Sequence, residues 1–186
     1  MKHLYKYSMY IFVAMLFVAC SNDDDNTPEV VNEEEVITTL VALFTPTTGG
    51  GGITLQSRDL DGDGPNAPVV TASGNLAANT TYNVAISFLN ETETPLENIT
   101  LEVVEEADEH QVFFLPGTGL NLTLVYGDFD GDGNPLGTMM EATTGDVGSG
   151  NLLVVLRHEP KKPNDGTLVD AGGETDISVS FPVTVQ

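Results

Sequence analysis

Strict alternation of apolar and polar residues marks two segments of this chain. The apolar face of residues 82–88 consists of Tyr82, Val84, Ile86 and Phe88. Residues 177–185 follow the same rule, with Ile177, Val179, Phe181, Val183 and Val185 on one face. A period of two predicts a strand with one buried face. Because Pro182 cannot donate a hydrogen bond to a neighbouring strand, we expect 177–185 to lie at a sheet edge.

Other apolar segments complete a set of short strands. Residues 36–44 and 152–156 are more continuously apolar, as central strands are. Five more strands are predicted, at 53–57, 68–73, 111–115, 122–126 and 138–143. Gly, Asn, Asp and Pro occupy the gaps between them. The pattern predicts a mainly all-β fold, an antiparallel β-sandwich of immunoglobulin-like type.

Residues 95–109 depart from the strand pattern. Thr94 is a suitable N-cap, Pro95 suits the first helical position, and Glu97 follows three residues after the cap. Apolar residues then recur at helical spacing at Ile99, Val103 and Ala107. We expect a short helix that crosses between sheets, and the β-branched residues leave a strand at 99–104 as the alternative.

The chain contains an internal repeat. Residues 59–64 and 128–133 share the pattern Asp-x-Asp-Gly-Asp-Gly at an offset of 69 residues. Without a gap, the same offset pairs residues 53, 55, 84 and 86 with apolar residues 122, 124, 153 and 155. The match predicts two structurally equivalent halves, each with the order strand, acidic loop, strand, loop, strand.

The first 35 residues read as an export and anchoring segment. Residues 1–19 combine Lys2 and Lys6 with a short apolar stretch, as in a signal peptide. A small residue precedes Cys20, the only cysteine, so we expect cleavage and lipidation there. Residues 20–35 then form an acidic tether that is too polar to order itself. These features predict a lipoprotein anchored in the outer membrane, at the cell surface.

Composition narrows the functional classes. Cleavage before Cys20 removes Lys2 and Lys6, which leaves 4 basic against 28 acidic residues and a net charge near −24. Nucleic acid is therefore excluded as a partner, because phosphate binding needs clustered Lys and Arg. Divalent cations and basic proteins remain compatible with this charge. The length of residues 36–186 suits a single domain, and one cysteine permits no intramolecular disulfide.

The chain resembles a family of small flavobacterial surface lipoproteins over nearly its full length. The resemblance rests on the tether and on six short segments, at residues 32–40, 58–65, 89–93, 109–111, 156–160 and 171–176. Members of this family often bear the label of a type 1 periplasmic binding fold, which implies a two-lobed α/β protein. The present sequence is too short and too rich in strands for that fold. The resemblance supports surface display and implies no activity.

The acidic loops are candidates for calcium binding. Carboxylates at alternate positions, here Asp59, Asp61 and Asp63 and the equivalent Asp128, Asp130 and Asp132, resemble the start of a calcium loop. The bidentate Glu of an EF-hand is missing, because Val70 and Met139 occupy its position. A looser Ca²⁺ loop and a simple Asp-Gly turn remain alternatives.

The two histidines of the mature chain are candidates for a transition-metal site. Glu106 and His110 stand four residues apart, on one face of the expected helix. His158 ends an expected strand and is followed by Glu159. If the fold brings His110 and His158 together, they and Glu106 or Glu109 could hold Zn²⁺ or Cu²⁺. The alternative is that each histidine is an ordinary surface or hydrogen-bonding residue.

No catalytic motif is present, so an enzyme is not expected. The sequence favours a binding or transport-accessory lipoprotein that serves an outer-membrane transporter or captures a metal ion or small ligand. A calcium-stabilised structural or adhesive module is the alternative.

Overall fold

The protein is an antiparallel all-β sandwich, as the sequence predicts. The computed structural model describes residues 35–62 and 64–186. Nine strands lie within these ranges: β1 Thr39–Pro46, β2 Ile53–Arg58, β3 Val69–Ala72, β4 Thr81–Leu89, β5 His110–Pro116, β6 Leu122–Tyr126, β7 Met139–Thr144, β8 Gly148–His158 and β9 Glu174–Val185. Two short helices accompany them, α2 Thr100–Glu105 and α3 Leu168–Ala171.

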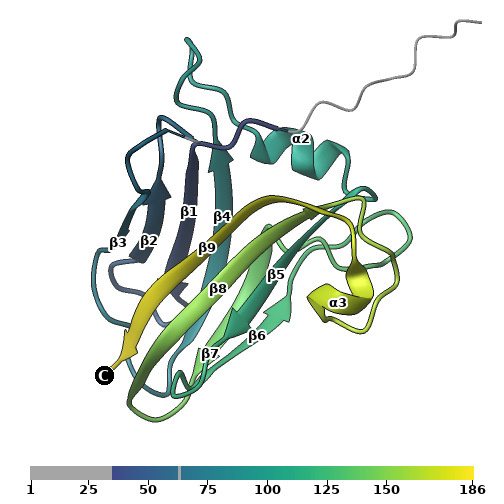
Figure 1. Cartoon of the computed structure of the whole chain (residues 1–186). Helices are drawn as coiled ribbons and strands as arrows, with labels where there is room; N and C mark the ends of the chain where they lie inside the picture. The colour runs from purple at the N-terminus through teal and green to yellow at the C-terminus, as the bar shows by residue number, and fades with distance from the viewer. Residues whose placement is uncertain (1–34, 63) are drawn as a thin grey trace, which may run out of the picture. The chain divides into compact units, whose positions relative to one another are not determined.

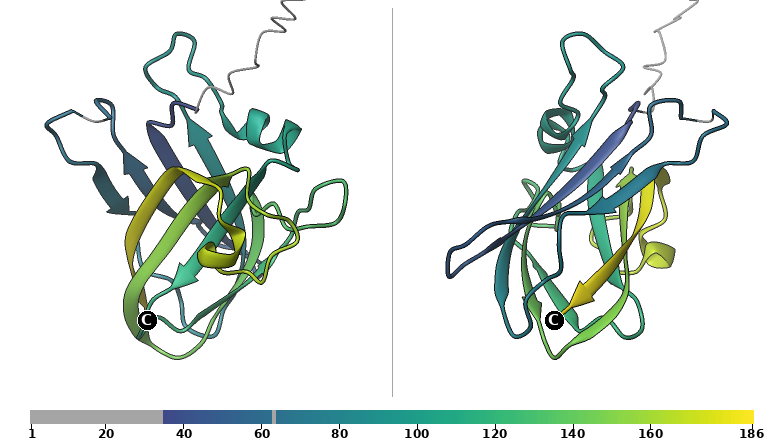
Figure 2. Two further views of the ribbon diagram at one scale, coloured as in Figure 1. Left: turned by 45° about the vertical axis from the view of Figure 1, so that its right-hand side comes forward. Right: turned by 90° about the vertical axis from the view of Figure 1, so that its left-hand side faces the viewer.

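The strands form two sheets (Figure 1). The larger sheet has the order β3-β2-β1-β4-β7-β6, and the smaller has the order β5-β8-β9. Figure 2 shows the smaller sheet lying across one face of the larger one. One apolar core joins the inner faces of both sheets, with Phe44, Phe88 and Phe181 among its fully buried members.

The positions of the central and edge strands agree with those predicted from the apolar pattern of the sequence and from Pro182. β1 pairs with both β2 and β4, and β8 pairs with both β5 and β9. β9, which contains Pro182, is an edge strand of the smaller sheet. The predicted apolar face of residues 82–88 is buried along its whole length, since no member is more than 3% exposed.

The helix is shorter than the sequence predicts. The backbones of Asn90 and Glu97 bond to each other in both directions, at 3.1 and 3.2 Å, so residues 91–96 form the loop between them. Thr94 and Pro95 therefore lie in this loop and do not begin a helix. α2 starts only at Thr100, whose N–H donates to the Asn98 side chain. The predicted bounds of 95–109 are wrong at both ends, although the helix does connect the two sheets.

The repeat maps onto two hairpins of the larger sheet. β2 and β3 flank the first acidic loop and pair with each other, as β6 and β7 do around the second. The third strands of the two units separate, because β4 belongs to the larger sheet and β8 to the smaller.

The connection from β8 to β9 covers the outer face of the smaller sheet. It carries α3, and Ala171 of this helix packs on Phe113 and Val155. Among the residues described, no helix is long and apolar enough to cross a membrane.

Candidate metal centre

The strand register brings the two histidines together. His110 begins β5, His158 ends β8, and the two are direct partners in the antiparallel ladder. Partners in such a ladder project to the same face of the sheet. Their ring centroids are 4.7 Å apart and the ring planes are inclined by 62°. His110 is fully buried and His158 is 7% exposed.

A bulge adds an aspartate to the pair. Leu156 is opposite Ile177, whereas Arg157 is opposite Thr175, so Asp176 is the extra residue of β9 at this point. A β-bulge re-aims the side chain of the inserted residue. The Asp176 side chain is fully buried, and its Oδ1 lies 3.9 Å from Nδ1 of His158.

Glu35 supplies a second carboxylate from the segment that leads into β1. Its side chain is only 5% exposed. Oε1 lies 3.2 Å from Nε2 of His110, and Oε2 lies 3.7 Å from Nδ1 of His158. We refer to Glu35, His110, His158 and Asp176 as the metal centre. One ligand atom from each of these residues lies within 4.8 Å of the others.

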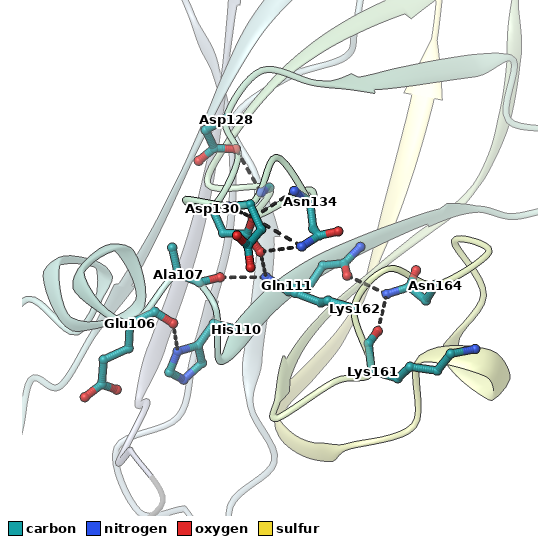
Figure 3. A network of polar contacts seen from close by, with 12 residues as sticks. Glu106, Ala107, His110, Gln111, Asp128, Asp130, Asn134, Lys161, Lys162 and Asn164 are labelled. Carbon is teal, nitrogen blue, oxygen red and sulfur yellow. Dashed lines mark hydrogen bonds and ion pairs between the residues drawn. The ribbon is translucent and has the colours of Figure 1, made fainter.

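The hydrogen bonding of His110 determines which of its ring nitrogens carries the proton. Nδ1 is 3.1 Å from the backbone carbonyl oxygen of Glu106, which can only accept, so Nδ1 carries the proton (Figure 3). Nε2 is buried and makes no hydrogen bond to any residue that the structure describes. Neutral imidazole would therefore direct a bare lone pair at Glu35. Metal-ligating histidines have this arrangement, with the second nitrogen donating to a carbonyl or carboxylate.

The distances between the ligand atoms of the metal centre, and the chemical types of these ligands, fit one divalent ion. Ligand atoms about 2.1 Å from a tetrahedral Zn²⁺ are roughly 3.4 Å from one another. The contacts of 3.2, 3.7 and 3.9 Å within the centre are close to that value. Two imidazoles and two carboxylates are also ligand types that Zn²⁺ binds in proteins.

The sequence predicted two other carboxylates for this site. His110 is the first residue of β5 and not part of a helix, so Glu106 does not share a helical face with it. Glu106 contributes its backbone carbonyl, while its carboxylate lies near Glu35 and Glu102. Glu109 lies near His158 and Glu159. Neither belongs to the group that contains both histidines.

Sequence reasoning missed Glu35 and Asp176 for identifiable reasons. The sequence places Glu35 at the end of the predicted acidic tether, where one more Glu carries no distinct signal. Asp176 immediately precedes the predicted strand 177–185, and alternation alone places it on the face opposite to Ile177. Only the bulge directs it inward.

The carboxylates of the second acidic loop accept hydrogen bonds from nearby backbone N–H groups and from one hydroxyl group. The Asp128 carboxylate accepts from the backbone of Gly137 and from the backbone and hydroxyl of Thr138. Asp130 accepts from the backbone N–H groups of Asp132 and Asn134. These bonds are those of a structured turn, whereas Asp132 itself is exposed.

Lys162 supplies a positive charge to this loop (Figure 3). Its Nζ lies 3.3 Å from Oδ2 of Asp130 and 2.6 Å from the carbonyl oxygen of Ala107. Burial acts to raise the pKa of Asp130, but the bonds from Asn134 and Lys162 outweigh it and hold the pKa below its ordinary value. Burial lowers the pKa of Lys162 despite the neighbouring carboxylates.

Among the residues that the structure describes, no lysine or arginine forms an ion pair with the first acidic loop. Asp59 accepts from the backbone of Asp61 and Gly62, and Asp61 accepts from the side chain of Asn66 at 2.8 Å. The bond from Asn66 lowers the pKa of Asp61. Asp63 lies outside the described residues, as do Cys20 and the rest of the predicted anchor. Calcium binding by either loop stays a prediction.

Comparisons with known proteins add no family: no family model, no curated protein and no solved structure matches this chain.

Proposed function

We propose that this protein is a metal-binding module that holds a divalent transition-metal ion, Zn²⁺ or Cu²⁺, at Glu35, His110, His158 and Asp176. The observation that carries the proposal is the buried Nε2 of His110, which faces the Glu35 carboxylate at 3.2 Å without a hydrogen bond. A lone pair and a carboxylate oxygen at that distance repel each other unless a cation or a proton lies between them.

A metal-free alternative exists in which both imidazoles are protonated and pair with the two carboxylates. A measurement of Zn²⁺ binding at equilibrium distinguishes the metal-bound centre from this metal-free alternative. We expect the full chain, purified in detergent and stripped with chelator, to bind one equivalent of Zn²⁺, measured by calorimetry. The same Zn²⁺ should shift the imidazole NMR signals of both histidines.

Isosteric variants locate the ion. Glu35→Gln and Asp176→Asn keep the shape of each side chain and remove its charge, and each should weaken Zn²⁺ binding by more than tenfold. Glu105→Gln is the matched control, since Glu105 is exposed and belongs to none of the groups of potential ligands. Equal affinity in the wild type and in both centre variants would show that any bound Zn²⁺ lies outside this cluster.

The proposed setting is the outer membrane, with the module anchored through acylated Cys20 and serving a transporter there. The predicted signal peptide, Cys20 and the predicted acidic tether support this setting. Radioactive palmitate should label the wild type and not Cys20→Ala. Protease treatment of intact cells should remove the domain from the surface, and full protection would place it on the periplasmic side.

A calcium-stabilised surface module is the second hypothesis. It is favoured by Asp59, which is half-buried, and Asp61, which is exposed, since neither forms an ion pair with the residues described. Millimolar Ca²⁺ should then raise the melting temperature of the stripped protein, because an ion that binds only the native state stabilises it. An unchanged melting temperature would remove this hypothesis.

A further inference from the structure

Glu35 differs from the other three ligands of the metal centre in its place in the fold. His110, His158 and Asp176 belong to β5, β8 and β9, the strands of the smaller sheet. Glu35 precedes β1, which belongs to the larger sheet. An ion that binds all four side chains therefore joins the segment before β1 to the smaller sheet.

Few other contacts hold that segment. The backbone hydrogen bonds of the fold begin at Thr38, whose N–H donates to the carbonyl oxygen of Leu89 at 3.0 Å. No backbone hydrogen bond joins residues 35–37 to the rest of the described chain. Val36 is 60% exposed, and Ile37 is partly buried against the core. We refer to residues 35–37 as the lead segment.

The burial of Glu35 requires a positive charge. Its side chain is 5% exposed, and no lysine or arginine of the described residues pairs with it. The groups beside it are the imidazoles of His110 and His158, at 3.2 and 3.7 Å. Next to neutral imidazoles, a buried carboxylate has lost its hydration without gaining a cation, which is unfavourable. Movement of the lead segment into water would restore that hydration and break few other contacts.

Resting on the metal centre proposed above, we propose that the bound ion holds the lead segment on the smaller sheet and that removal of the ion releases this segment into solvent. Four protein ligands complete the tetrahedral sphere of Zn²⁺ and leave no position for water, as in structural zinc sites. The lead segment directly follows the predicted acidic tether in the sequence. Metal occupancy thus sets where the tether joins the folded domain: at Glu35 with the ion, and at Thr38 without it.

Limited proteolysis of the full chain tests this. Protein purified in detergent is stripped with chelator and kept at about pH 8, where few protons compete with the metal. A protease that cleaves after glutamate is added with or without one equivalent of Zn²⁺, and mass spectrometry follows cleavage between Glu35 and Val36. Cleavage of a folded protein requires local release of the chain. We expect Zn²⁺ to slow this cleavage by about tenfold or more.

Two controls separate release of the lead segment from other effects of Zn²⁺. Glu93 is exposed and lies in the loop 91–96, so cleavage after Glu93 should not change with Zn²⁺. Asp176→Asn removes a ligand but leaves the lead segment intact. In this variant, the Zn²⁺ concentration needed for protection should rise by the same factor as the dissociation constant. Glu105→Gln should be protected like the wild type.

The outcomes distinguish the two proposals. Zn²⁺ that binds with one-to-one stoichiometry but leaves cleavage after Glu35 unchanged would overturn the holding role and leave the metal centre standing. Equal slowing of cleavage after Glu35 and after Glu93 would also overturn it, because the effect would not be confined to the lead segment. Failure of the wild type to bind Zn²⁺ would instead overturn the metal centre itself.

Discussion

His110 and His158 are direct partners across β5 and β8, with ring centroids 4.7 Å apart. They stand 48 positions apart in the sequence and meet because β5 and β8 pair from the first residue of one to the last residue of the other. This register places both imidazoles at one end of the smaller sheet, on its inner face, where Glu35 and Asp176 approach them.

The first prediction concerns the pH dependence of Zn²⁺ binding. Zinc binds the unprotonated imidazole, so protons compete with the metal. Affinity should therefore be retained near neutral pH and fall progressively below about pH 6. Calorimetric titrations at a series of pH values test this. An affinity that does not change between pH 7 and pH 5 would contradict ligation by His110 and His158.

The second prediction concerns the buried ion pair. Lys162 and Asp130 are 6% and 1% exposed in their side chains. Lys162→Met should destabilise the protein by about 3 kcal/mol, because it leaves a buried carboxylate without its cation. Lys161→Met is the control. Its partner Asp170 is a third exposed, and loss of such a surface pair should cost less than about 1 kcal/mol. Urea unfolding measures the loss of stability in each variant. Equal losses would contradict the expected difference between the buried and the exposed ion pair.

The third prediction concerns Glu91. Hydrogen bonds from Arg58 and Thr39 hold the pKa of Glu91 at about 2, below its ordinary value of 4.5. A depressed carboxyl pKa stabilises the folded state above pH 4.5, and this contribution disappears as the pH falls from 4.5 toward 2.

An NMR titration of the Glu91 carboxyl carbon should give a midpoint near 2 in the wild type. Arg58→Ala removes the bidentate partner and should move that midpoint upward, toward the ordinary value. A midpoint that stays in place would show that Arg58 is not the cause.

The fourth prediction compares two glycines of the second acidic loop. Gly137 and Gly133 both have positive φ, at 96° and 84°. A Cβ on Gly137 would lie 2.7 Å from the carbonyl oxygen of Val112 in β5, whereas one on Gly133 meets nothing within 4 Å. Gly133→Ala should cost about 1 kcal/mol, from the backbone conformation alone. Gly137→Ala should cost about 3 kcal/mol or more, since β5 must also move.

Thermal unfolding of the two variants tests this difference. A cost for Gly137→Ala no larger than that for Gly133→Ala would show that the contact with β5 relaxes freely.

Local pattern explains why the strands could be predicted. The alternation in residues 82–88 and 177–185 reflects burial of one strand face, which is a property of neighbouring residues. Pro182 marked an edge strand for an equally local reason, its missing N–H group. The helix was misplaced because Thr94 and Pro95 carry the chemistry of a helix start, yet the pairing of Asn90 with Glu97 closes a loop around them.

The sequence by itself determined the all-β class, the strand positions and the identity of the two histidines as candidate ligands. Only the tertiary structure decided what surrounds them. The pairing of His110 with His158 depends on strand register, and the inward direction of Asp176 depends on a bulge. Glu35 joins them from 75 residues before His110. Contacts between distant segments follow from the packing of the whole sandwich, and no local pattern of apolar and polar residues encodes them.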